Sequence, residues 1–332
     1  MERLSPNLNS LTVSSLMSRS FYFRISSEYP QCLTRKKKDG PMKPAPFEYF
    51  APDSLDGALT TLQESGFDAK LLAGGQSLVP VMNFRLSQPA VLIDINPLTE
   101  LNFIRHDAAT NELRLGAMVR HRQLEMSPLV AEHAPLLHET MPYIAHPQIR
   151  NRGTLGGSLA HADPAGELPM IAVTLNGRIR LQNTTGSRWV NAPDFFTSLF
   201  ETACEDNEMV TEVALPAMPA RTGYAFQEMA RRHGDYALAG VAALVTVDTS
   251  GACTAARLVY LNLGEIPMVA HKAAGMLVGH GFSEELVMET AVTASQEEIE
   301  PTGDIHATTE YKRHLAKVLT ERVLRQAFEK TK

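Results

Sequence analysis

Two glycine pairs set among small hydroxyl residues restrict this chain more than any other feature of its sequence. The first lies in Ala73-Gly74-Gly75-Gln76-Ser77, and the second, about 80 residues later, in Thr154-Leu155-Gly156-Gly157-Ser158. Paired glycines permit positive φ and bring backbone N–H groups close to an anion, while Ser and Thr hydroxyls add donors. Each loop could therefore cradle a phosphate, and together they fit a diphosphate. On the residues alone, two tight turns remain an equal alternative.

The remaining composition is that of an ordinary globular protein. The 332 residues suffice for two domains, with 44% hydrophobic and 20% charged side chains. The longest apolar run, 237–247, is well below the roughly 18 residues of a membrane-spanning helix, so we expect no membrane span. Beyond residue 41 the chain has 24 basic and 34 acidic residues, a net charge of −10. This acidity makes nucleic acid an unlikely partner class.

The cysteines argue against a metal centre in this chain. Cys32, Cys204 and Cys253 are far apart, and none lies in a Cys-x-x-Cys motif or beside a histidine at metal-ligand spacing. Because zinc sites and iron–sulfur clusters take about four ligands, we expect no metal site. A sparse, odd cysteine count is also typical of a reducing compartment, so we expect a cytoplasmic protein.

Common catalytic motifs are missing as well. The sequence contains no G-x-G-x-x-G, no G-x-x-x-x-G-K-[ST], no H-E-x-x-H and no G-x-S-x-G. A Rossmann domain, a P-loop NTPase and a serine hydrolase are therefore disfavoured. We assign no catalytic side chain.

The first 41 residues differ from the rest. They are rich in Ser, Asn and Arg, lack a sustained period of 2 or 3.6, and hold seven basic residues against three acids. A transit peptide, a disordered arm and residues upstream of the natural start are the alternatives, and we favour the last two. We expect 1–41 to be a disordered extension and the fold to begin near Met42.

The next segment alternates helices and strands. Asp53 or Ser54 is expected to cap a helix that ends at Gly66. The apolar runs 69–73 and 91–95 predict strands on either side of the first loop, in the pattern β, glycine turn, β. The apolar runs 103–104 and 113–117 are expected to form a hairpin, and 129–144 is expected to be helical but broken by its prolines. Together these elements indicate a mixed α+β domain.

A domain boundary is expected at Leu215 to Pro219, where two prolines cannot continue a strand interior. Beyond it, 239–247 and 257–263 predict two strands joined by a turn at Asp248 to Gly251. An apolar stripe from Leu315 to Phe328, with charges opposite, predicts an amphipathic last helix.

The two glycine loops also carry a family resemblance. The runs 70–80 (KLLAGGQSLVP) and 151–169 (NRGTLGGSLAHADPAGELP) resemble the FAD-binding medium subunit of molybdenum hydroxylases, of the carbon monoxide dehydrogenase and, more distantly, xanthine dehydrogenase type. The resemblance extends from about Met42 to Gln326. It implies an α+β fold with a two-lobed FAD-binding domain (PCMH type) at 42–217 and an α+β C-terminal domain (carbon monoxide dehydrogenase flavoprotein type) at 222–328.

The resemblance also implies which residues contact FAD. Both loops would wrap the diphosphate with main-chain donors, Gly75 and Gly156 lying where the backbone touches it. Arg231 and Arg232 are expected to form a structural ion-pair face with Asp235 rather than a cofactor clamp. The implied cofactor-binding residues are Ala73, Gly74, Gly75, Gln76, Ser77, Ile144, Thr154, Leu155, Gly156, Gly157, Ser158, Asp163, Glu167, Val210 and Tyr236.

By the same resemblance the chain is an electron-transfer subunit. It would take electrons from a small subunit with [2Fe–2S] clusters, beside a large molybdopterin subunit, in a dimer of heterotrimers, and pass them to an external acceptor. Two alternatives remain open: a self-contained FAD-dependent reductase of the enolpyruvyl sugar nucleotide type, and a non-catalytic nucleotide-binding module.

Overall fold

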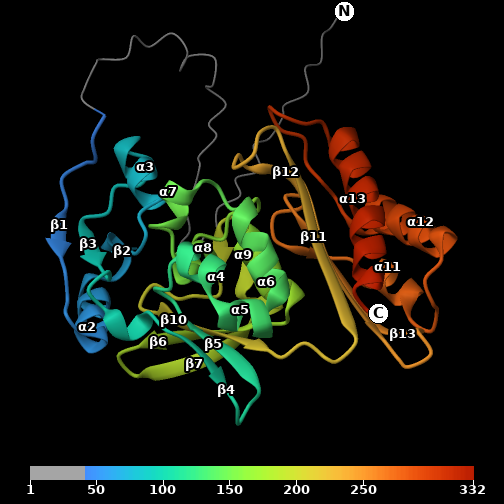
Figure 1. The fold of residues 1–332 in the computed structure, drawn as a ribbon. Helices are drawn as coiled ribbons and strands as arrows, with labels where there is room; N and C mark the ends of the chain where they lie inside the picture. The colour runs from blue at the N-terminus through green and yellow to red at the C-terminus, as the bar shows by residue number, and fades with distance from the viewer. Residues whose placement is uncertain (1–41) are drawn as a thin grey trace, which may run out of the picture.

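The structure is a computed structural model that describes residues 42–332. The extension expected at 1–41 lies outside the described residues. Figure 1 shows a small blue lobe, a larger green and yellow lobe, and an orange to red C-terminal part built on long strands. Each part has its own sheet with helices packed on it. This arrangement confirms the predicted α+β fold.

The small lobe holds a three-stranded parallel sheet in the order β1-β3-β2. The Ser54 side chain accepts a hydrogen bond from the Gly57 N–H at the start of α2, and Gly66 ends this helix at φ 53°, as the sequence predicted. The elements are β1 (Glu48–Phe50), α2 (Leu55–Ser65), η1 (Gly66–Asp68), β2 (Ala69–Leu72), α3 (Leu78–Asn83), β3 (Val91–Asp94) and η2 (Thr99–Leu101).

The predicted pattern β, glycine turn, β is wrong in one respect. The short helix α3 lies between β2 and β3, and these strands pair in parallel, with Leu71 beside Ile93. A parallel pair cannot be joined by a tight turn, so the chain must cross over before it re-enters the sheet. The first glycine loop is consequently the strand-to-helix connection at the carboxyl end of β2.

The second lobe is an antiparallel sheet in the order β4-β5-β10-β6-β7, with helices packed over one face. The predicted hairpin is confirmed by the pairing of β4 with β5, and the predicted helical stretch is broken at Pro135 as expected. The elements are β4 (Ile104–Asp107), β5 (Glu112–Gly116), α4 (His121–Met126), α5 (Pro128–His133), α6 (Pro135–Thr140), η3 (Met141–Tyr143), α7 (Pro147–Arg150), α8 (Leu155–His161), α9 (Glu167–Thr174), β6 (Arg178–Asn183), β7 (Gly186–Asn191), α10 (Ala192–Phe195), β8 (Phe196–Ser198), β9 (Glu201–Thr202) and β10 (Met209–Pro216).

The C-terminal part is a four-stranded antiparallel sheet covered by three helices. The predicted turn at Asp248 to Gly251 joins β12 to β13, and the amphipathic last helix is confirmed, with Leu315, Leu319 and Val323 buried against the sheet. The elements are β11 (Thr222–Ala230), β12 (Ala237–Val247), β13 (Cys253–Leu261), β14 (Met268–Val269), α11 (His271–Leu277), α12 (Glu284–Thr293), η4 (Ala294–Glu298) and α13 (Thr309–Glu329).

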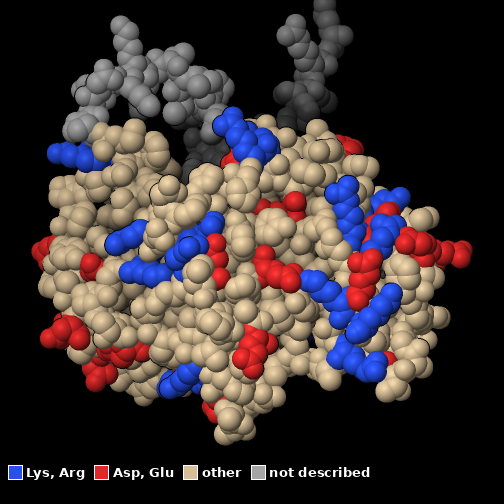
Figure 2. Space-filling view, viewed as in Figure 1, with Lys and Arg blue, Asp and Glu red and all other residues tan. Residues whose placement is uncertain are grey.

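Helix α9 joins the second lobe to the C-terminal sheet. It packs against β12 and β13, and Arg257 on β13 donates a hydrogen bond of 2.6 Å to the Val173 carbonyl oxygen. On the face in Figure 2, basic and acidic side chains are interspersed, with the densest mixture over the C-terminal helices. None of the helices in residues 42–332 has both the length and the hydropathy needed to cross a bilayer.

Candidate cofactor-binding site

The first glycine loop leaves its backbone donors free. Residues 73–77 connect β2 to α3, and Gly75 adopts φ +73°, a conformation that favours glycine. The backbone N–H groups of the four residues 74–77 donate no hydrogen bond within residues 42–332. Free, adjacent N–H groups that are only partly covered can bind an anion.

The second glycine segment is a helix start rather than a loop. Thr154 is the N-cap of α8, and its hydroxyl oxygen accepts the Gly157 N–H at 3.2 Å. Gly156 is buried, and a Cβ on it would lie 2.6 Å from the Ala117 Cβ. The structure thus gives Gly156 a packing role, and its expected contact with a phosphate remains a prediction.

The backbone donors of the second segment are already engaged. Each pairs with an oxygen of the protein, so this segment differs from the first in what it offers to an anion. The pairs are Leu155 N with Val119 O (2.9 Å), Gly156 N with Ala117 O (2.8 Å), Gly157 N with Thr154 Oγ1 (3.2 Å) and Ser158 N with Thr154 O (3.1 Å). The Ser158 hydroxyl remains as the polar group of this turn that can face a ligand.

The two segments lie against each other in space. A Cβ built on Gly74 would be 2.5 Å from the Arg152 carbonyl oxygen and 2.8 Å from the Gly153 Cα. A Cβ built on Gly157 would be 3.6 Å from the Ala73 Cβ. Segments 80 residues apart in the sequence therefore form one composite site, and Gly74 is needed because the backbones approach so closely.

Arg120 ties the two segments together. Its Nη2 donates to the Asn96 Oδ1 at 2.6 Å, and its Nη1 donates to the Arg152 carbonyl oxygen. Asn96 in turn donates from Nδ2 to the Ala73 carbonyl oxygen at 2.9 Å. A charge-assisted bridge of this kind fixes the spacing between the segments. Arg120 and Arg152 also add positive charge beside the free N–H groups.

Asp94 anchors the same network from β3. It accepts hydrogen bonds from the Tyr49 hydroxyl (2.5 Å) and the Asn96 N–H (2.9 Å). Burial opposes ionisation, but these two donors outweigh it and lower the pKa of Asp94. The carboxylate therefore stays charged and holds Asn96 in place.

Asp163 and Tyr236 come together, although 73 residues separate them. Both line a pocket of about 380 Å³ between the turn before α9 and the segment before β12. Tyr236 is 67% exposed, which leaves its side chain accessible to a ligand. Arg231 donates to Asp235 at 2.9 Å, which confirms the predicted structural ion pair.

Two half-buried acids lie near this pocket. Burial, reinforced by the charge of Asp163, raises the pKa of Glu167 to about 7. Burial and then the charge of Glu167 raise the pKa of Glu228 to about 8, and its Oε2 has no hydrogen-bond partner in residues 42–332. A buried carboxyl oxygen without a partner is unusual in a folded protein, and a bound ligand could supply the missing hydrogen bond.

The other two predicted contacts lie in the core. The Ile144 side chain is 7% exposed, and its carbonyl oxygen accepts a hydrogen bond of 2.9 Å from the buried Arg150. Val210 is 5% exposed on β10, beside a register shift in the pairing of β10 with β6. Their contacts with a cofactor remain predictions.

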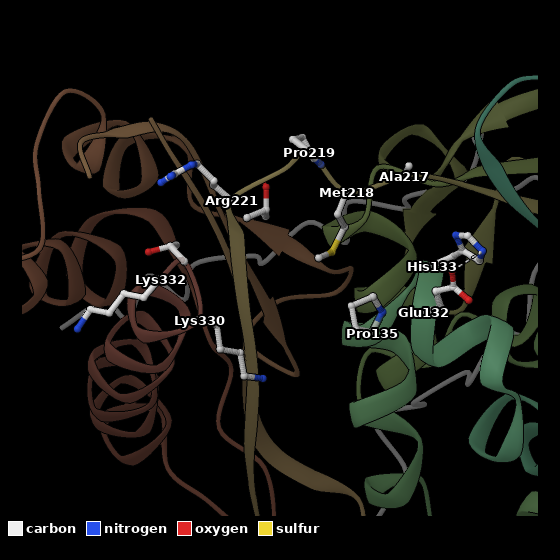
Figure 3. A pocket seen from close by; sticks show the side chains of 11 residues that line it. Glu132, His133, Pro135, Ala217, Met218, Pro219, Arg221, Lys330 and Lys332 are labelled. Atoms are coloured by element: carbon white, nitrogen blue, oxygen red, sulfur yellow. Dashed lines mark ion pairs between the residues drawn. The ribbon is translucent and has the colours of Figure 1, made fainter. Parts of the chain in front are cut away.

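A second pocket, of about 540 Å³, lies between α5, the linker after β10 and the end of α13 (Figure 3). Its basic residues do not converge. Lys330 is engaged with Glu139 at 2.7 Å, whereas Figure 3 shows Arg221 and Lys332 extending away from the His133 side. This pocket lacks the convergent donors of the glycine segments.

Comparison with known proteins identifies the family. Residues 45–218 match the FAD binding domain in molybdopterin dehydrogenase, and residues 224–327 match the CO dehydrogenase flavoprotein C-terminal domain. The chain belongs to this family of FAD subunits. It is accordingly a subunit of a multi-subunit oxidoreductase, and FAD is its cofactor.

The similarity to these relatives covers nearly the whole length of each of them. The chain is 39% identical to the 6-hydroxypseudooxynicotine dehydrogenase complex subunit alpha of Paenarthrobacter nicotinovorans, over 88% of this chain and 97% of the relative. It is 37% identical to the carbon monoxide dehydrogenase medium chain of Hydrogenophaga pseudoflava (86% and 99%). The structure of carbon monoxide dehydrogenase from that organism matches with a TM-score of 0.83 at 37% identity, covering 86% of this chain and 99% of that one. Quinoline 2-oxidoreductase from Pseudomonas putida 86 also gives 0.83, at 38% identity and with 87% and 99% covered.

The residues present fit the FAD diphosphate. Four free N–H groups and a glycine at positive φ supply donors for a dianionic group, and the charges of the adjoining Arg120 and Arg152 favour it. Sequence reasoning missed Arg120, His121, Asp94 and Asn96. Only the last two carry a signal, because polar residues at the carboxyl end of a parallel strand often line a ligand site.

Proposed function

We propose that this chain binds one FAD, takes electrons from [2Fe–2S] clusters of a partner subunit and passes them to an external acceptor. The observation that carries the FAD site is the contact between the two glycine segments, one of which presents four free backbone N–H groups. Bound FAD exchanges one or two electrons, which suits a station between one-electron donors and a two-electron acceptor.

The N–H groups of 74–77 and the Ser158 hydroxyl are proposed to bind the diphosphate. Tyr236, on the segment before β12, is proposed to cover the flavin ring from the C-terminal domain, since its exposed ring shares a pocket with Asp163. Thr154, Leu155, Gly156 and Gly157 shape the cradle by capping and packing α8. The remaining proposed contacts are Ile144, Asp163, Glu167 and Val210.

The partners are proposed to be a large molybdopterin subunit and a small [2Fe–2S] subunit, in a dimer of heterotrimers. Support comes from relatives named as the alpha, beta or medium members of dehydrogenase complexes. We further propose a cytoplasmic location, an FAD-binding domain at 42–217 and a C-terminal domain at 222–328.

The test compares the full chain alone with the reconstituted complex. Alone, it is expected to be yellow with one FAD per chain, and to pass electrons from an artificial donor to a dye without oxidising a purine, carbon monoxide or an N-heterocycle. Turnover of one of these substrates is expected only after the molybdenum and cluster subunits are added. Full turnover by the chain alone would refute the electron-relay function and favour a self-contained oxidoreductase.

A further inference from the structure

The first turn of α8 has one hydrogen-bond donor left over. All four of its backbone N–H groups, from Leu155 to Ser158, are paired with oxygens of the protein. The Ser158 Oγ lies 2.9 Å from the His121 Nε2, and no other acceptor for its hydroxyl proton is found in residues 42–332. The direction of that proton therefore depends on whether the His121 Nε2 donates or accepts this hydrogen bond.

The neighbours of His121 fix its tautomer. Its Nε2 also lies 3.1 Å from the Thr154 carbonyl oxygen, and a carbonyl oxygen can only accept. The Nε2 must accordingly carry the proton, and toward Ser158 it acts as a donor as well. The Ser158 oxygen then accepts from the imidazole, and its own proton points elsewhere.

Packing keeps the imidazole neutral and in place. His121 is 4% exposed, and its Nδ1 is buried with no hydrogen-bond partner in residues 42–332. Its ring lies against Gly153, where a Cβ would come within 2.7 Å of the Cε1 and 2.8 Å of the Nδ1. Burial, with the nearby charges of Arg150 and Arg120, lowers the pKa of His121 to about 4. A second ring proton would have no acceptor, so the tautomer persists at neutral pH.

We propose that His121 is a positioning residue for the FAD diphosphate: its Nε2–H holds the Ser158 oxygen as an acceptor, so that the Ser158 hydroxyl donates to a phosphate oxygen. This inference rests on the proposed function of the two glycine segments. Under this proposal the two glycine segments contribute different kinds of hydrogen-bond donor to the diphosphate. The first segment supplies main-chain donors, whereas the second supplies a side-chain donor aimed by a buried histidine.

Two isosteric variants separate the role of Nε2 from the role of the ring. The amide nitrogen of Gln reaches the position of Nε2, while that of Asn reaches only the position of Nδ1. The full chain is stripped of FAD and titrated with FAD, the bound fraction being followed by flavin fluorescence. We expect H121Q to bind within about 3-fold of the wild type and H121N to bind about 10-fold more weakly. His138→Asn, a half-buried histidine of α6, is the control and is expected to leave the affinity unchanged.

A double-mutant cycle tests whether His121 acts through Ser158. S158A is expected to weaken FAD binding about 10-fold, and H121N in the S158A background to add no more than about 2-fold. Losses that multiply would mean that the two residues act independently and would overturn the proposal. So would equal losses in H121Q and H121N.

The phosphorus NMR spectrum of bound FAD gives a test that needs no destabilised variant. S158A is expected to shift the diphosphate resonances, and H121Q to leave them at the wild-type positions. Unchanged resonances in S158A would refute the contact. The outcomes remain separable, because a wild-type chain that binds no FAD refutes the proposed function itself, whereas FAD bound without coupling refutes only the role of His121.

Discussion

Replacement of Gly74 by alanine tests the composite site most directly. The new Cβ would lie 2.5 Å from the Arg152 carbonyl oxygen, so the two backbones must part by at least half an ångström to restore even a 3.0 Å contact. Overpacking of this kind typically costs about 1–3 kcal/mol. Gly74 is half-buried and belongs to none of the core clusters, so the apo protein can relax there, and the cost then falls on FAD binding. We expect the Kd for FAD to rise roughly 5- to 150-fold.

Two other glycines serve as matched controls. Gly156→Ala places its Cβ 2.6 Å from the Ala117 Cβ inside the core, so we expect a loss of about 1–3 kcal/mol in the free energy of unfolding. Gly275 on α11 is exposed with nothing within 4 Å of its Cβ position, and alanine there is expected to stabilise the protein by about 0.5–1 kcal/mol without changing FAD affinity.

The assay measures FAD affinity by fluorescence titration and stability by urea unfolding of the apo chain, for all three variants. The expected pattern is a weaker affinity for G74A and a lower stability for G156A. If G74A keeps the wild-type Kd within about 2-fold while its stability falls like that of G156A, the first segment is a structural turn and the reasoning is refuted.

Three further predictions follow from other contacts. The acids Glu167 and Glu228, with pKa values of about 7 and 8 in the fold, hold protons that the unfolded chain releases near 4.5, so the stability of the apo chain should fall from pH 5 to pH 8 and then level off. Unfolding curves at each pH test this, and E228Q should flatten the profile. Burial raises the pKa of Cys204 to about 12, so iodoacetamide at pH 8 should modify it in the urea-unfolded but not in the native chain, as read by mass spectrometry. Arg150→Ala removes the hydrogen bonds of the buried guanidinium to Glu125 and to the Ile144 carbonyl oxygen, although Arg122 still pairs with Glu125 at 2.9 Å. The free energy of unfolding should therefore fall by about 1–3 kcal/mol, and an unchanged value would contradict a structural role for Arg150.

Local signals in the sequence predicted much of the fold. The Ser54 cap, the stop at Gly66 and the stripe of the last helix depend on residues within one or two helical turns, and all three are confirmed. Helix α3 was missed because its six residues, LVPVMN, contain a proline and too few turns to show a period. Strand β6, RIRLQN, has the alternation of a half-buried strand and was overlooked, whereas the edge strand β7, GSRWVN, places its two apolar residues side by side and shows no period of 2.

The two glycine motifs show where prediction from local sequence ends. Both have a glycine pair and a following serine, yet the first keeps its N–H groups free and the second does not. Two of the N–H groups of the second segment are taken by the local N-cap residue Thr154, and the other two by Ala117 and Val119, whose carbonyl oxygens reach the segment from the end of β5 more than 35 residues earlier in the chain. A motif reports which donors a segment contains, whereas long-range pairing decides which of them remain available to a ligand. The same argument explains why His121 carried no signal: its importance lies in two distances, to Thr154 and Ser158, that exist only in the folded chain.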